Sequence, residues 1–341
     1  MALLEVSNLC ITLQTHRGRA QAVRDVSFTL ERGATLGLIG ESGCGKSLTA
    51  LALMGLLPDH AQVEGSIQLG GKELLGLNER QLSVLRGNRM AMVFQEPMSA
   101  LNPVHSIGRQ VAEPLRIHQG LSRAQARARA TELLERVGIA QAAQRLDEYP
   151  HQFSGGQRQR IMIAMALACG PDLLVADEPT TALDVTVQQR ILDLLQELVA
   201  EHSMALVLIS HDLGVIAQNA EQLLVMYGGT VAESGMTETV FAQRAHPYTR
   251  GLFAARPQLQ ATSHKEHLST IAGAVPELVD LPAGCPFAGR CSYTQSNCFV
   301  EHPQPRTLHQ PIVAPASLAS WRQPHLVRCL HEQALSAGVQ V

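Results

Sequence analysis

The chain has 341 residues, of which 45% are hydrophobic and 17% charged, with a formal net charge of −3. This composition is globular and sufficient for one large domain or two ordinary ones, and it excludes a mainly disordered chain. The acidic balance and the 4% of aromatic residues exclude a nucleic-acid binder that relies on a basic surface or on base stacking.

No apolar run approaches the roughly 18–20 residues that a membrane-spanning helix needs. The nearest run, at residues 161–170, is too short, and residues 1–10 lack the basic segment of a secretory signal. We therefore expect a cytoplasmic protein that reaches a membrane only by docking onto a partner. In a reducing compartment its seven cysteines are expected to be thiols or metal ligands rather than disulfides.

Strands alternate with helices along most of the chain. The runs at 35–40, 172–177 and 205–210 are continuously apolar, as in strands buried on both faces. Further strands are predicted at 26–30 and 66–74, and helices at 47–57, 122–137 and 185–202. In helix 122–137 we expect Ser122 as the N-cap and Leu133, Leu134 and Val137 facing inward. The alternation predicts βαβ units around a parallel sheet, and therefore an α/β fold.

The character changes after about residue 245. Ten of the 17 prolines and four of the seven cysteines lie in 245–341. Because proline disrupts regular structure, we predict a separate, irregular Pro/Cys-rich C-terminal module.

A phosphate-binding loop is predicted at Gly40–Ser47. The sequence GESGCGKS fits G-x-x-x-x-G-K-[ST] and stands between a buried strand and a helix, a context that favours a P-loop over a glycine-rich turn without a ligand. Lys46 is expected to bridge the β- and γ-phosphates, and Ser47 to bind Mg²⁺. Residues expected to contact ATP are Gly40, Ser42, Gly43, Cys44, Gly45, Lys46, Ser47 and Leu48. For Cys44 a role as small spacer is favoured over a redox sensor.

Two adjacent carboxylates, Asp177 and Glu178, end the buried strand at 172–177. Such a pair is usually a solvated turn, but a P-loop upstream favours catalysis. We expect Asp177 to hold Mg²⁺ through a water, and Glu178 to polarise the water that attacks the γ-phosphate.

The sequence FSGGQ at 153–157, followed by a helical run, resembles the signature motif of the ATP-binding cassette (ABC) ATPases. The other cassette motifs follow in order. Gln95 resembles the Q-loop glutamine, which also binds Mg²⁺; Thr181–Asp184 resembles the D-loop; and His211 resembles the switch histidine. The resemblance covers residues 1–250. It implies an ATPase domain at 1–245 with a RecA-like core, an antiparallel β subdomain and an α-helical signature subdomain at about 90–165.

The resemblance also implies a mechanism. Two cassettes pack head to tail, so that Ser154, Gly155, Gly156 and Gln157 act on the ATP held by the partner, beside the D-loop residue Asp184. ATP binding closes the dimer and hydrolysis reopens it. Cassettes usually stack an aromatic residue on adenine about twenty-five residues before the P-loop; this chain offers His16 and Arg17 instead, which stack more weakly.

Residues 96–108 and 245–252 and the segment GCPF…RC…C…C resemble the cassettes of peptide, nickel and related importers. This implies an oligopeptide-transporter-type extension at 246–341, a second and different ATPase subunit, two transmembrane permease subunits and a solute-binding protein. The location implied is the cytoplasmic face of the bacterial inner membrane. Dipeptides or oligopeptides are the expected solute; nickel chelates, glutathione and peptide antibiotics are alternatives. A soluble ABC ATPase of translation or DNA repair is disfavoured, because the chain lacks tandem cassettes and a long coiled-coil insertion.

Four cysteines follow the spacing Cys285-x5-Cys291-x6-Cys298-x30-Cys329. The interpretations are unrelated buried thiols, disulfides, a zinc site and a 4Fe–4S cluster. Zinc sites typically use shorter C-x₂₋₄-C spacings, so the wider loops favour the cluster, with zinc as the alternative. In either case we expect a structural role in a module short of core residues. The histidines nearby, His302, His309 and His325, are expected at the surface.

Overall fold

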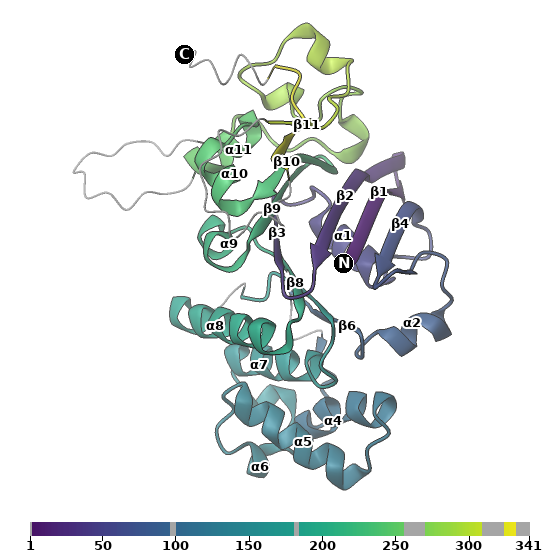
Figure 1. Ribbon diagram of the computed structural model, residues 1–341, viewed down its shortest axis with the longest axis vertical. Helices are drawn as coiled ribbons and strands as arrows, with labels where there is room; N and C mark the ends of the chain where they lie inside the picture. The colour runs from purple at the N-terminus through teal and green to yellow at the C-terminus, as the bar shows by residue number, and fades with distance from the viewer. Residues whose placement is uncertain (1, 96–99, 181–183, 256–269, 309–323, 332–341) are drawn as a thin grey trace, which may run out of the picture.

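The computed structural model describes residues 2–95, 100–180, 184–255, 270–308 and 324–331. Its centre is an eight-stranded sheet with the strand order β11-β12-β10-β9-β3-β8-β7-β6 (Figure 1). The strands are β3 (Thr35–Ile39), β6 (Met90–Val93), β7 (Leu173–Asp177), β8 (Ala205–Ile209), β9 (Gln222–Tyr227), β10 (Thr230–Met236), β11 (Arg306–Thr307) and β12 (Leu326–Val327). Strands β9, β3, β8, β7 and β6 are parallel, which confirms the α/β prediction.

The parallel strands are apolar throughout because both faces of the sheet are covered. Successive side chains of a strand point to opposite faces. In β7, Leu174 and Ala176 enter the core beneath the helices, whereas Leu173 and Val175 enter a second core. That second core is shared with the N-terminal sheet, so the large sheet separates two hydrophobic layers.

The N-terminal sheet is antiparallel, with the order β2-β1-β4-β5. Its strands are β1 (Ala2–Thr15), β2 (Gly18–Glu31), β4 (Gln62–Leu69) and β5 (Lys72–Glu73). Helices α1 (Lys46–Leu53) and α2 (Glu79–Leu85) follow β3 and β5 in the chain. Side chains of α1 and β2 share the second core, and this packing brings β2 against the loop between β3 and α1.

A helical layer lies on the other side of the large sheet and extends past its end (Figure 1). Its elements are α4 (Ile107–His118), α5 (Arg123–Arg136), α6 (Ala142–Arg145), the 3₁₀ turn η1 (Pro150–Gln152), α7 (Gly155–Ala166), α8 (Val185–His202) and α9 (Leu213–Asn219). Helices α4 and α5 pack against α7 and form one end of the molecule. Ser122 caps α5, and Leu133, Leu134 and Val137 are buried as expected. Among the described helices, none has the length and apolar character needed to cross a membrane.

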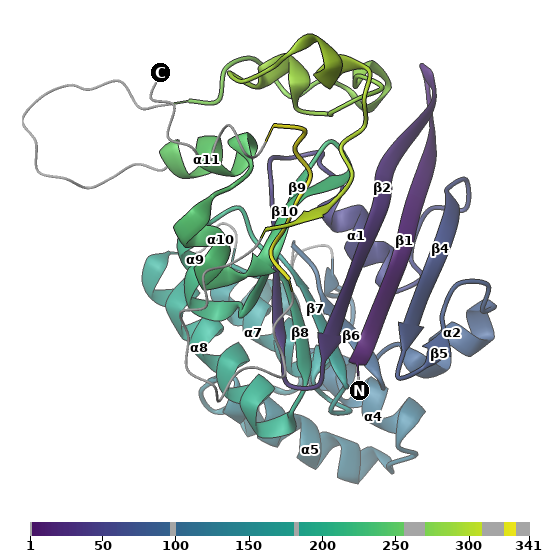
Figure 2. The ribbon, with the colours of Figure 1, turned by 45° about the horizontal axis from the view of Figure 1, so that its top comes forward.

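The C-terminal segment, the described residues after Met236, lies toward the end of the molecule opposite α4–α6 and beside the tip of the β1–β2 hairpin (Figures 1 and 2). It contains α10 (Thr237–Gln243), α11 (Pro247–Ala254) and the 3₁₀ turns η2 (Leu278–Asp280), η3 (Ala288–Arg290) and η4 (Ser296–Phe299). Strand β12 pairs with β10, and β11 pairs with β12. The last part of the described chain thereby joins the central sheet.

A buried polar pair fixes that strand. The His325 Nε2 atom lies 2.8 Å from Oε1 of Glu233, and both side chains are fully buried. Backbone N–H groups of Ala245 and His246 also donate to the Glu233 carboxylate. The expectation that His325 lies at the surface is therefore wrong, because its ring satisfies a buried carboxylate. His302 is partly buried, and His309 lies outside the described residues.

Candidate functional site

The loop between β3 and α1 adopts a curled backbone that depends on glycine. Gly40 and Gly45 have φ values of +150° and +101°, in the region that favours glycine. A Cβ at Gly40 would lie 2.2 Å from the Met226 carbonyl oxygen, and a Cβ at Gly45 would lie 2.8 Å from the Ala22 carbonyl oxygen. The loop is thus wedged between β9 and β2, while Ser42, Gly43 and Ser47 remain exposed.

Lys46 lies inside this curl. Its ammonium donates to the carbonyl oxygens of Gly40, at 2.7 Å, and Glu41, at 3.1 Å. The Cys44 sulfur is 3.6 Å from the same ammonium and is buried. Burial raises the pKa of the Cys44 thiol, so it resembles a packed spacer more than a reactive thiol.

The two residues predicted to bind Mg²⁺ from the P-loop and from the end of β7 meet in the structure. Burial raises the pKa of Asp177; the nearby Ser47 hydroxyl opposes this rise, and the nearby Glu178 charge adds to it. A hydroxyl and a carboxylate together are oxygen donors of the kind that Mg²⁺ prefers. Gln95 reaches this side of the site by donating a hydrogen bond to Glu178, the residue that follows Asp177.

Gln95, Glu178 and His211 come from three different segments and converge. Gln95 Nε2 donates to Glu178 Oε2 at 3.1 Å, and His211 Nδ1 lies 3.3 Å from the same oxygen. Glu178 has φ +47°, an uncommon value for a non-glycine residue that is often found at functional sites. Its N–H donates to the Ile209 carbonyl oxygen, which fixes it at the end of β7 beside β8. The arrangement can hold a water and accept its proton.

The signature motif forms the start of α7. Ser154 is the N-cap: its hydroxyl accepts from the Gln157 N–H, and the Gln157 side chain accepts from the Ser154 N–H. Ser154 and Gly155 are exposed, so a helix N-terminus with its partial positive charge faces outward. Gly156 packs closely against α8, where a Cβ on residue 156 would lie only 2.8 Å from Val187 Cγ1. The close packing therefore leaves no room for a side chain at this position.

Two other predicted elements lie at the edges of the site. Asp184 caps α8, accepting from the Val187 N–H at 3.0 Å; Thr181–Leu183 of the D-loop and residues 96–99 lie outside the described part of the chain. Arg17, at the tip of the β1–β2 hairpin, donates to both carboxylate oxygens of Asp280 and to Glu277. The N–H groups at the edge of the Arg17 guanidinium are thus held by Glu277 and Asp280 of the C-terminal segment.

Sequence analysis missed a contact between the C-terminal segment and the P-loop. The Glu41 N–H donates to the Tyr248 hydroxyl at 2.8 Å, and the Glu41 carboxylate pairs with Arg290 at 2.7 Å. Tyr248 lies in the family-like stretch 245–252, which gave a hint of its importance. No sequence pattern links Glu41 with Arg290, because 249 positions separate them.

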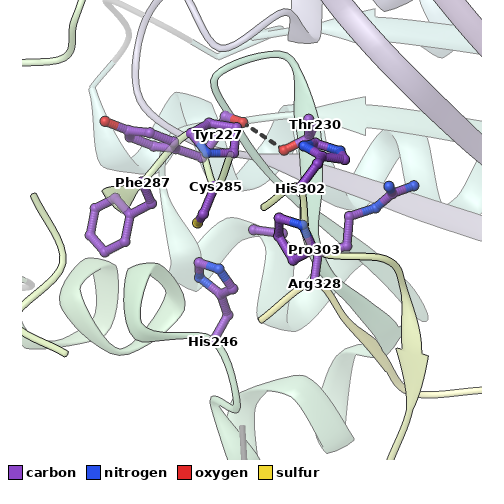
Figure 3. Close-up of a pocket in the computed structure, with 10 residues that line it drawn as sticks. Tyr227, Thr230, His246, Cys285, Phe287, His302, Pro303 and Arg328 are labelled. Carbon is purple, nitrogen blue, oxygen red and sulfur yellow. Dashed lines mark hydrogen bonds between the residues drawn. The ribbon is translucent and has the colours of Figure 1, made fainter. Parts of the chain in front are cut away.

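An aromatic cluster joins this contact to the cysteines. The rings of Tyr227, Tyr248 and Phe287 lie 4.7–5.3 Å apart, from centroid to centroid. Figure 3 shows Cys285 between Tyr227 and His246, at the edge of a small pocket that Phe287 and Arg328 also line. Edge-on and tilted contacts of this kind stabilise a core by about 0.5–1.5 kcal/mol per pair. The segment around Cys285 is therefore packed on the core rather than hanging free.

The four cysteines of the C-terminal segment line one common pocket, together with the ring of Phe287 and His331. Burial raises the pKa of the Cys285 thiol to about 12, and it also raises the pKa of Cys291. All four are free thiols in the structure. Within the described ranges, no three His, Cys, Asp or Glu side chains form a group that would hold a single metal ion.

Comparison with known proteins agrees with this geometry. A family model described as "ABC transporter" matches residues 23–181, and one described as "Oligopeptide/dipeptide transporter, C-terminal region" matches 232–298. The oligopeptide transport ATP-binding protein OppD of Haemophilus influenzae is 49% identical over 298 residues, 87% of this chain and 92% of that protein. OppD of Salmonella typhimurium is 49% identical over 87% of this chain and 88% of its own.

Solved structures show the same likeness. The dimeric ABC transporter cassette MJ0796 superposes with a TM-score of 0.62 at 27% identity, over 69% of this chain and 98% of that chain. Another structure of MJ0796 describes a dimeric post-hydrolysis state bound to ADP and Pi, with the same TM-score.

Proposed function

The chain belongs to the ATP-binding proteins of ABC transporters that carry the oligopeptide/dipeptide transporter C-terminal region, and from this premise we propose that it hydrolyses ATP to power the import of peptides. One observation carries the proposal. Gln95 and His211 both approach the carboxylate of Glu178, which directly follows Asp177 in the chain.

The proposed chemistry follows from these positions. The P-loop N–H groups and Lys46 bind the triphosphate. Ser47, Asp177 and Gln95 would hold Mg²⁺, which would supply positive charge to offset that of the phosphates. Glu178 orients the attacking water and accepts its proton, and His211 holds Glu178 and the γ-phosphate in register. Most of the rate enhancement is then positioning and charge stabilisation.

A second cassette completes each site in this proposal. The support is that Ser154 and Gly155 are exposed at the start of α7, where they face away from the chain's own core and are available to a partner's ATP. We propose a partner ATPase subunit of a different sequence, two permease subunits contacted through the helical layer, and a solute-binding protein. The chain would then lie peripherally on the cytoplasmic face of the inner membrane.

The domain boundaries proposed are 1–245 for the ATPase and 246–341 for the extension, with a helical subdomain at about 90–165. The extension would hold a 4Fe–4S cluster through Cys285, Cys291, Cys298 and Cys329. The donor set supports this: four cysteines line one pocket, and four thiolates are the usual ligands of such a cluster.

When bound, a cluster would supply a structural crosslink in a segment poor in regular structure. Iron and acid-labile sulfide measured on anaerobically purified protein test the cluster. About four of each per chain support it, and zinc without iron contradicts it.

Uptake by cells tests the transport function. Cells that lack the chain are complemented with the wild type or with Lys46→Ala, and they receive labelled dipeptide, oligopeptide, glutathione or nickel chelate in parallel. We expect peptide uptake to return only with the wild type. Recovery with glutathione or nickel alone would reassign the solute, and recovery of peptide uptake with Lys46→Ala would contradict the function.

A further inference from the structure

Arg290 lies in the C-terminal segment, directly before Cys291, and its side chain reaches the P-loop residue Glu41. Its Nη1 lies 2.7 Å from Glu41 Oε2, and its Nη2 lies 3.1 Å from Glu41 Oε1. This is the two-bond, fork-like pairing that gives arginine its geometric specificity for carboxylates. Only 5% of the Arg290 side chain is exposed, so solvent screens the pair weakly.

The other donors of Arg290 fix its position from the C-terminal side. Nε donates to the Ala272 carbonyl oxygen at 2.9 Å, and Nη2 also donates to the carbonyls of Ile271 and Gly273. Arg290 ends the turn η3, and Cys291 follows it directly. The guanidinium is thus held by a segment that is distant in sequence from the P-loop and presented to Glu41 as a rigid group.

Glu41 is held through all of its polar groups. Its N–H donates to Tyr248, its carbonyl oxygen accepts from Lys46 at 3.1 Å, and its carboxylate accepts from Arg290. A movement of Glu41 would therefore move one of the two carbonyls that hold the Lys46 ammonium. An unneutralised carboxylate at this place would also add negative charge to the loop that receives a triphosphate.

We propose that Arg290 is a positioning residue of the ATP site, which holds Glu41 within the P-loop and neutralises its carboxylate so that the loop accepts a triphosphate. The inference rests on the proposed ATP-binding function and adds a residue of the C-terminal segment to that site.

The effect should fall on ATP binding more than on the chemical step. In Arg290→Gln the Glu41 carboxylate stays partly buried and charged but loses its partner. An unpaired buried charge of this kind is destabilising. We expect the dissociation constant for Mg-ATP to rise about tenfold or more, where a tenfold change corresponds to ~1.4 kcal/mol. Turnover at saturating ATP should change much less, because Gln95, Glu178 and His211 are untouched.

Calorimetric titration with Mg-ATP in a Glu178→Gln background separates binding from hydrolysis. The double variant Arg290→Gln/Glu41→Gln removes both charges and should recover most of the lost affinity, whereas a role in folding alone predicts no recovery. Arg290→Lys, which keeps the charge without the fork, should fall between the wild type and Arg290→Gln.

Asp25→Asn is the matched control. It removes the negative charge from the 2.8 Å pair between Arg328 and Asp25, another link from the C-terminal segment to the core, and asparagine tolerates the φ of +48° at this position. We expect its ATP affinity to stay within about twofold of the wild type, since a twofold change is well under 1 kcal/mol.

The inference is overturned if Arg290→Gln loses no more ATP affinity than Asp25→Asn, or if the double variant binds no more tightly than Arg290→Gln. Should Arg290→Gln not fold, an Arg290→Lys affinity equal to that of Asp25→Asn overturns it. Lys46→Ala distinguishes this failure from failure of the proposed function. If the wild type binds Mg-ATP no better than Lys46→Ala, the ATP site itself is wrong.

Discussion

His211 Nδ1 lies 3.3 Å from Glu178 Oε2, and the two side chains differ in exposure, at 66% and 18% respectively. The carboxylate is therefore fixed and largely covered, whereas the imidazole is accessible from outside. His211 follows β8 and Glu178 follows β7, and these strands are neighbours in the sheet. A small shift between the two strand ends would be enough to change the distance between base and histidine.

The first prediction concerns Glu178→Gln. The amide keeps the size of the side chain and its bond to Gln95 but cannot accept a proton, so hydrolysis should fall by about 10²-fold or more while ATP binding persists. Steady-state phosphate release and equilibrium Mg-ATP binding, measured on the same preparation, check both halves. Near-normal hydrolysis would remove Glu178 from its proposed role.

A second prediction concerns the exposed start of α7. A Cβ at Gly155 would meet no atom within 4 Å, so Gly155→Asp should fold normally while placing a negative charge where a partner's triphosphate would lie. We expect the variant to bind ATP through its own P-loop but to lose ATP-driven dimerisation and hydrolysis. Gly155→Ala is the control and should retain most activity. Equal behaviour of the two variants in ultracentrifugation and hydrolysis would contradict a role for this residue across the dimer.

Arg17 gives a third prediction, about the base of ATP. Asp280 and Glu277 hold the edge of the guanidinium, which leaves its flat face available for stacking on adenine. Arg17→Ala should weaken ATP binding several-fold, with a smaller effect on inorganic triphosphate. Titrations with both ligands compare the losses; an equal loss for ATP and triphosphate would exclude contact with the base.

Motifs that a short stretch of sequence defines could be predicted from the sequence. Contacts between segments far apart in the chain could not. The P-loop, Asp177–Glu178 and the apolar strands follow from short patterns, because a curled phosphate loop needs its glycines locally and a buried strand needs apolar residues on both faces. The inward face of helix 122–137 followed in the same way. Pairing of Arg290 with Glu41 depends on how two remote segments pack, which no local pattern encodes. Strands β11 and β12 have two residues each, too few for any periodicity to show.

A fourth prediction follows from the cysteine pocket. Cys291→Ser removes one of four proposed ligands, so the iron and sulfide content of anaerobically purified protein should fall to less than half of the wild-type value, on the order expected for the loss of one ligand of four. Cys169→Ser, which changes a cysteine outside the pocket, should keep the wild-type content. Equal metal content in the two variants would contradict ligation by Cys291.

The last prediction concerns the buried Glu233 and its pH dependence. Burial alone would raise the pKa of this carboxyl, but hydrogen bonds from His325 and two backbone N–H groups lower it below its usual value. A carboxyl with a lowered pKa in the folded state stabilises the protein above its unfolded pKa, of about 4.3, and this contribution disappears as the pH falls through the folded value. Glu233→Gln should therefore destabilise the chain at pH 7, by about 3 kcal/mol, because it removes the charge that His325 and the backbone donors satisfy.

The difference between Glu233→Gln and the wild type should shrink as the pH falls below about 4, since the unfolded carboxyl then binds a proton, and it should vanish below the lowered folded-state pKa. Urea unfolding of both proteins between pH 3 and 7, in roughly unit steps across the titration range of a carboxyl, measures this difference directly. Glu238→Gln, a change of another glutamate in the neighbouring helix α10, is the control and should show no such trend. A stability difference that stays constant over this range would mean that packing, and not the charge of Glu233, holds β12 against β10.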